Sequence, residues 1–147
     1  MTERDPNCAT AQLFLLFCYL YTERFESAME TGKNLLKVDK NHPTGLLATA
    51  VAMLHQSVKR TCRVPQELQL SAFALLFHYR NLVQSDEGNY NLARAFHMVG
   101  VLDLACRHYR MALDGVFGKE AAYNLHLIAL LNGETALAKH YLDRIVI

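Results

Sequence analysis

A sequence motif occurs twice in the second half of the chain. The stretches NYNLARAFHMVGVLDLACRHYRMALD (89–114) and AYNLHLIALLNGETALAKHYLD (122–143) both contain Tyr-Asn-Leu, followed by a glycine and then an alanine at the same spacing. The corresponding positions lie 33 residues apart and are Leu92 and Leu125, Gly100 and Gly133, and Ala105 and Ala138. A fixed period of this length predicts stacked structural units of one kind.

Each unit has apolar residues at helical spacing on both sides of its glycine. In the first copy these residues are Leu92, Ala95, Phe96 and Val99 before the glycine, and Leu102, Ala105, Tyr109 and Ala112 after it. Gly100 and Gly133 suit the left-handed conformation that ends a helix. Ala105 and Ala138 are small enough to let two helices approach closely. The unit is therefore predicted to be a helix, a tight turn and a second helix.

This pattern resembles the tetratricopeptide repeat, a helical hairpin of 34 residues. The matching positions are Tyr90, Asn91, Leu92, Phe96, Gly100, Ala105, Tyr109 and Ala112, and then Tyr123, Asn124, Leu125, Gly133 and Ala138. The sequence departs from the repeat at Asn89, where tryptophan is usual, and at Ala93, where glycine is preferred. The resemblance implies an α-solenoid that winds as a right-handed superhelix.

The rest of the chain continues the pattern less regularly. We predict one all-α domain (1–147) of about four helical hairpins, with repeats at about 8–40, 44–85, 87–116 and 119–147. In the first repeat Ala28 takes the small-residue position, and Glu23 stands where the turn glycine is expected. The second repeat is stretched, and we place its extra length in the loop 58–64 and in a long helix that begins at Pro65.

Composition and charge indicate one ordinary globular domain. The 147 residues are 52% hydrophobic and carry a formal net charge of +1, which gives no field strong enough to imply binding to nucleic acid or an anionic membrane. Lys59, Arg60 and Arg63 form a tight basic cluster, which we interpret as a solvated loop. The apolar run from Leu13 to Tyr21 is too short to span a bilayer, and we expect no membrane contact.

The four cysteines, at positions 8, 18, 62 and 106, show no Cys-x-x-Cys spacing. We interpret them as reduced, buried side chains of an intracellular protein. The sequence also contains no His-Glu-x-x-His, no Walker glycine loop, no Gly-x-Gly-x-x-Gly and no Gly-x-Ser-x-Gly. We therefore predict no enzymatic activity, no metal, no cofactor and no small-molecule substrate, and expect a binding scaffold.

A more specific resemblance covers about residues 34–147. The stretches QLSAFALLFHYRNL (69–82), YNLARAFHMVGVLDLACRHYRMAL (90–113) and AYNLHLIALLNGETALAKHYL (122–142) are similar to the carboxyl-terminal end of the tetratricopeptide subunit of transcription factor IIIC. That family also carries a further amino-terminal repeat array and an acidic segment, which this sequence lacks. The resemblance implies a nuclear subunit that assists initiation by RNA polymerase III, contacts other subunits and components of transcription factor IIIB, and meets DNA only indirectly.

The last repeat is the predicted binding surface, because the end of a helical stack has no following repeat to cover it. Its predicted contact residues are Leu127, Leu130, Leu131, Ile145 and Ile147. The geometry of the tetratricopeptide family, which the sequence resembles, implies that Leu13, Phe17, Leu20 and Tyr21 of the first repeat face the groove or neighbouring helices. The alternative is a stand-alone adaptor or co-chaperone that binds a peptide in the concave groove through polar side chains.

Overall fold

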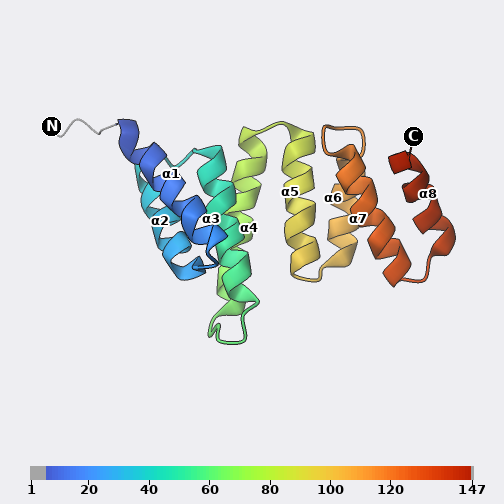
Figure 1. Ribbon diagram of the computed structural model, residues 1–147, viewed down its shortest axis with the longest axis horizontal. Coiled ribbons are helices and arrows are strands. Elements are labelled where there is room, and N and C mark those ends of the chain that lie inside the picture. Colours follow the sequence, from blue (N-terminus) through green and yellow to red (C-terminus); the bar gives the residue numbers. More distant parts are fainter. Residues whose placement is uncertain (1–5, 147) are drawn as a thin grey trace. The chain divides into compact units, whose positions relative to one another are not determined.

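The computed structural model describes residues 6–146, and these form eight α-helices and no strand (Figure 1). The all-helical fold predicted from the sequence is confirmed over this range. The helices are α1 (Pro6–Tyr21), α2 (Phe25–Val38), α3 (Pro43–Ser57), α4 (Pro65–Leu82), α5 (Ser85–Met98), α6 (Leu102–Met111), α7 (Gly118–Leu131) and α8 (Thr135–Val146). Pro65 begins α4, as predicted from the sequence, and Pro43 likewise begins α3, because a residue in the first turn of a helix needs no amide hydrogen.

The chain divides after Leu82 into two compact units. In the first unit α1 packs on α2, α2 on α3 and α3 on α4, and α1 also contacts α3. In the second unit α5 packs on α6, α6 on α7 and α7 on α8. The four repeats, their assembly into one domain and the right-handed superhelix remain predictions.

Three of the turns between consecutive helices have the same backbone geometry. Each contains one residue with positive φ, and the next amide donates to the carbonyl five residues back, which is the Schellman arrangement. The positive-φ residues are Glu23 (φ 58°), Gly100 (φ 83°) and Gly133 (φ 74°). The closing bonds run from Arg24 N to Tyr19 O, from Val101 N to Phe96 O and from Glu134 N to Ala129 O, at 2.8, 2.9 and 2.9 Å. Glu23 thus adopts the conformation that glycine adopts in the other two turns.

The small residues of the repeat pattern lie in the interior. Ala28, Ala105 and Ala138, each five residues after a positive-φ residue, are almost completely inaccessible to solvent. In the first unit Ala28 belongs to a core formed with Leu16, Leu35, Ala48 and Ala52, and Leu13 and Leu20 pack against that core. The largest fully buried side chains of the second unit are Tyr109, Leu92, Leu125 and Ile128.

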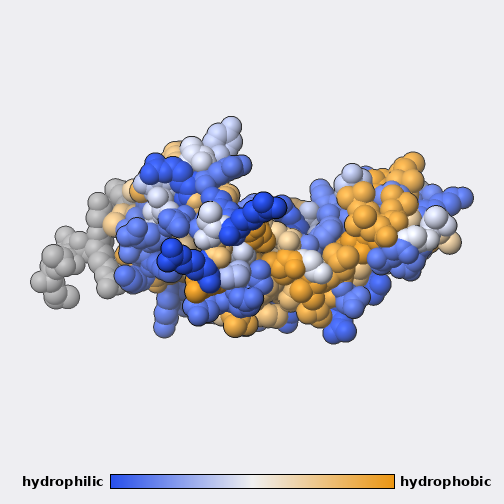
Figure 2. Space-filling model, turned by 90° about the horizontal axis from the view of Figure 1, so that it is seen from below, coloured by the Kyte–Doolittle hydropathy of each residue, from blue (hydrophilic) through white to orange (hydrophobic). Residues whose placement is uncertain are grey.

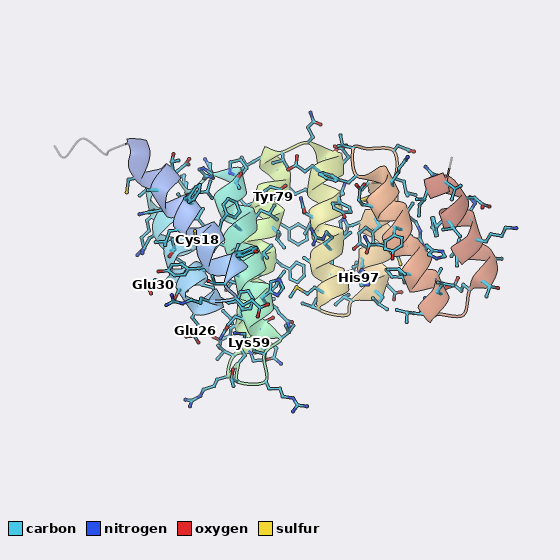
Figure 3. All side chains as sticks on the ribbon, in the orientation of Figure 1. Cys18, Glu26, Glu30, Lys59, Tyr79 and His97 are labelled. Atoms are coloured by element: carbon cyan, nitrogen blue, oxygen red, sulfur yellow. The ribbon has the colours of Figure 1, made fainter. Side chains whose placement is uncertain are left out.

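The structure contains the loop and the long helix that the sequence predicts between residues 58 and 82. The loop 58–64 joins α3 to α4, and α4, with 18 residues, is the longest helix described. Arg60 and Arg63 are exposed, whereas Lys59 places its Nζ 4.8 Å from the centroid of the Phe25 ring. Figure 3 labels Lys59 and, close to it in this view, Glu26 of α2. The loop is solvated, in agreement with its interpretation from the sequence.

The prediction that the cysteines are buried is wrong. Cys8 and Cys18 are exposed, Cys62 and Cys106 are partly exposed, and all four are free thiols. Cys18 lies on α1 (Figure 3), on the side of the helix that also carries the exposed Phe14 and Tyr21. An apolar helix has two sides and only one of them packs on the core, so apolar neighbours in sequence did not determine burial here. Among residues 6–146, no helix has the length and apolar character needed to cross a membrane.

Candidate protein-binding surface

Exposed apolar side chains gather on α7 and α8, where the binding surface was predicted. Leu130 is 49% exposed and Leu131 76% exposed, whereas Leu127 and Ile145 are partly buried. Ile147 lies outside the described residues. Figure 2 shows hydrophobic residues grouped on the surface of this α7–α8 part.

The packing of α7 explains which of its leucines remain accessible. Leu125, Ile128 and Ala129 are buried and hold one side of α7 in the core. Leu127 and Leu130 continue from Tyr123 at intervals of four and three residues, which places the three on one side of the helix. Tyr123 is 52% exposed and was not included in the predicted surface, although this spacing would have identified it.

The exposed side of α8 carries two further apolar residues that the sequence reasoning missed. Leu142 and Val146 are one helical turn apart and exposed, while Ala138 and Tyr141 face inward. Leu131 and Val146 lie at opposite ends of the α7–α8 hairpin, because the short turn 132–134 reverses the chain direction. A helix of this length extends about 18 Å. Ile145, next to Val146, is therefore far from Leu131, so the predicted residues that the structure describes lie along the hairpin and do not form one compact patch.

Polar contacts fix α8 to the rest of the second unit. His126 of α7 places its Nδ1 2.7 Å from the carbonyl oxygen of Ala138. Arg110 of α6 donates through Nε to the hydroxyl of Tyr141 at 3.4 Å. Arg144 forms an exposed ion pair with Asp114 at 3.1 Å, which is worth at most about 1 kcal/mol. The apolar surface is thus carried by a helix held at several points along its length.

A second set of exposed apolar residues lies on α1. Phe14 and Tyr21 are 74% and 91% exposed, and Phe17 on the same side of the helix is also exposed. The sequence had placed Phe17 and Tyr21 with Leu13 and Leu20 as residues facing the groove or neighbouring helices. The structure separates them, because Leu13 and Leu20 pack on the core of the first unit.

The histidine and tyrosine residues of α5 and α6 form part of the interior. His97 Nδ1 lies 3.2 Å from the hydroxyl of Tyr109, which has no solvent exposure. Burial lowers the pKa of His97 and raises the pKa of Tyr109 far above its usual value. Tyr90 stacks on Phe117 with ring centroids 4.8 Å apart. These groups pack against one another and leave no room for a substrate at the Tyr109 hydroxyl.

Asn124 of the repeated motif is hydrogen-bonded within its own helix, and the metal-ligating side chains of the described residues do not cluster. Asn124 donates through Nδ2 to the carbonyl of Glu120 in its own helix, at 2.8 Å. This contact agrees with a structural role for the asparagine of the repeated motif. Within residues 6–146 there is no group of three or more His, Cys, Asp or Glu side chains that could hold a metal ion.

The fold thus defines a class, an all-helical protein built from packed consecutive helices and typical of helical-repeat proteins. No family model matches the chain. It is 27% identical to the transcription factor tau 131 kDa subunit of Saccharomyces cerevisiae, over 95% of this chain and 15% of that protein. It is 28% identical to the transcription factor tau subunit sfc4 of Schizosaccharomyces pombe, over 69% of this chain and 13% of that protein. The aligned parts are therefore less than a sixth of either relative.

Proposed function

We propose that this chain is a non-catalytic protein-binding scaffold of transcription factor IIIC, acting in the nucleus during initiation by RNA polymerase III. The observation that carries the proposal is its similarity, over 95% of its length, to a subunit of transcription factor tau. The resemblance of the stretches 69–82, 90–113 and 122–142 to the tetratricopeptide subunit supports the same assignment. In this role the chain binds sister subunits and takes part in the recruitment of transcription factor IIIB.

The surface on α7 and α8 is the proposed contact with a sister subunit. Burying exposed leucines such as Leu130 and Leu131 in a partner contributes about 25 cal/mol for each Å² of apolar surface removed from water, before the entropic cost of association is subtracted. The net charge of +1 supports binding to proteins and not to DNA, because DNA binding depends on neutralising phosphates with lysine and arginine.

Co-purification from nuclear extract tests the proposal. The tagged full chain is expected to recover other subunits of transcription factor IIIC, and Leu130→Glu/Leu131→Glu is expected to lose them. Leu131→Glu and Val116→Glu form a matched pair, because the two side chains are 76% and 80% exposed and Val116 lies on the loop between α6 and α7. Only the change at Leu131 should weaken recovery, and circular dichroism of each variant should match wild type.

Two results would contradict this function. Recovery of an unrelated protein without any subunit of the factor would favour a stand-alone adaptor. Tight binding of the purified chain to promoter DNA, weakened by orders of magnitude as salt rises and unchanged by Leu130→Glu/Leu131→Glu, would indicate direct DNA binding. An apolar protein interface is expected to respond much less to salt.

A further inference from the structure

An apolar groove opens between α2, α3 and α4 of the first unit, with a volume of about 510 Å³. This volume lies within the range of roughly 300–1,000 Å³ typical of ligand sites. Thr49 and Met53 of α3 are buried and contribute to its lining. The remaining lining residues come from α2 and α4 and are Lys33, Leu36, Lys37, Ser71, Ala74 and Leu75.

The charged side chains that line the groove are both lysines. Lys33 and Lys37 are exposed and lie one helical turn apart on α2. Neither forms an ion pair with any residue in the range 6–146. No acidic side chain lines the groove, and the nearest glutamate preceding it on α2 is Glu30, labelled in Figure 3. The site therefore combines an apolar lining with two unpaired positive charges along one edge.

We propose that this groove binds an acidic amphipathic helix of a partner protein. Apolar side chains of that helix enter between Leu36 and Leu75, and two carboxylates one turn apart pair with Lys33 and Lys37. Charge complementarity selects this occupant, since the apolar lining calls for apolar side chains and the lysine edge calls for acids beside them. A DNA backbone would leave the apolar lining unused.

This inference rests on the protein-binding role proposed above and adds a second contact surface. The groove belongs to the first compact unit, whereas the α7–α8 surface belongs to the second. Each of the two proposals can be contradicted by an experiment that leaves the other untouched. Peptide binding is measured on the purified chain without other subunits. Co-purification of transcription factor subunits through Leu130 and Leu131 does not depend on it.

Three short synthetic helical peptides with a fluorescent label serve as probes. The first carries leucines on one side, flanked by glutamates one turn apart, the second has lysine in place of glutamate, and the third has serine in place of leucine. Their binding to the full chain is measured by fluorescence anisotropy. The variant is Lys33→Glu/Lys37→Glu, and its matched control is Lys119→Glu/Lys139→Glu, which reverses two exposed lysines of the second unit.

Wild type is expected to bind the glutamate peptide and to bind the lysine and serine peptides at least about tenfold more weakly, the combined effect of two exposed ion pairs or of lost apolar burial. Lys33→Glu/Lys37→Glu should bind the glutamate peptide about tenfold more weakly than wild type does and should bind the lysine peptide more tightly. The control variant should bind all three peptides as wild type does. The methyl resonances of Met53 and Ala74, which line the groove, should shift when the glutamate peptide is added.

Three outcomes would overturn the proposal. One is equal binding of the glutamate and lysine peptides. Another is binding without any change in the Met53 and Ala74 methyl signals, which would place the peptide elsewhere. The third is binding to duplex DNA or to phosphatidylserine vesicles with the same dependence on Lys33 and Lys37, together with no binding of the glutamate peptide.

Discussion

Thr49 of α3 lies so close to Gly32 of α2 that no side chain fits between them. A Cβ placed on Gly32 would lie 2.9 Å from both Cβ and Cγ2 of Thr49, and closer still to its hydroxyl oxygen. Both residues are buried, and the Thr49 hydroxyl donates to the carbonyl of Gly45 at 2.7 Å. The close approach of α2 to α3 therefore depends on glycine at position 32.

Gly32→Ala is expected to destabilise the protein by about 1–2 kcal/mol. Overpacking costs about 1–3 kcal/mol, and the better helix propensity of alanine returns up to about 1 kcal/mol. Thr49→Ala removes the hydroxyl oxygen and Cγ2 but keeps Cβ, which still lies 2.9 Å from the added methyl group, so Gly32→Ala should remain destabilising in that background but by less. Urea denaturation of the two single variants and the double variant measures this coupling. Equal effects of Gly32→Ala in both backgrounds would show that the hydroxyl and Cγ2 of Thr49 do not obstruct position 32.

Glu23→Gly is expected to stabilise the protein by up to about 1 kcal/mol. Glu23 has a φ of 58°, and this left-handed conformation costs a residue with a Cβ about 1–2 kcal/mol. Glycine avoids this cost, but it also makes the unfolded chain more flexible, and this offsets part of the gain in stability. Gly100→Ala introduces the same backbone strain and should destabilise the protein by about 1 kcal/mol. No steric clash adds to this cost, because no atom lies within 4 Å of the Cβ position. Thermal melts of the two variants should move in opposite directions.

Ala105→Leu tests the close packing of α5 and α6. Ala105 has no solvent exposure, so extra methyl groups must displace its neighbours, at a cost of about 1–3 kcal/mol. Lys139→Ala, at an exposed position of α8, is the control and should change stability by less than about 0.5 kcal/mol. A variant at position 105 as stable as wild type would contradict the role of this alanine in helix contact.

Stability is expected to fall as pH is lowered below about 6.5, in part because of His97. Burial lowers its pKa in the folded protein from the usual 6.5. Between the two pKa values the unfolded chain therefore binds a proton that the folded protein does not, so acid favours unfolding and stability rises with pH. His97→Gln removes this contribution, and its melting temperature should fall less than that of wild type between about pH 7 and pH 5. An identical fall in both proteins would exclude His97 as a source of the pH dependence.

The four thiols should differ in their rate of alkylation. Cys8 and Cys18 are exposed, whereas Cys106 is partly buried and burial raises the pKa of its thiol, which lowers the fraction of reactive thiolate. Iodoacetamide followed by peptide mass spectrometry should therefore modify Cys8 and Cys18 before Cys106. The order should disappear when the protein is unfolded in urea. Fastest labelling of Cys106 in the native state would contradict the burial described for α6.

Local features of the fold were predictable from the sequence because neighbouring residues decide them. Helix starts at Pro43 and Pro65 follow from the fixed φ and missing amide hydrogen of proline. The left-handed turns at Gly100 and Gly133 follow from the conformational freedom of glycine. The turn at Glu23 could be located only by the spacing of the repeat, since glutamate has no preference for that conformation.

Which apolar residues pack and which face solvent was decided by the tertiary structure. Leu13 and Leu20 lie in the same apolar run as Phe17 and Tyr21, yet the first two pack on the core and the other two are exposed. The exposure of Cys18 has the same origin. The groove with Lys33 and Lys37 on its edge arises only when α2, α3 and α4 come together. Sequence spacing places residues on the sides of a helix, whereas the neighbouring helices determine which side is covered.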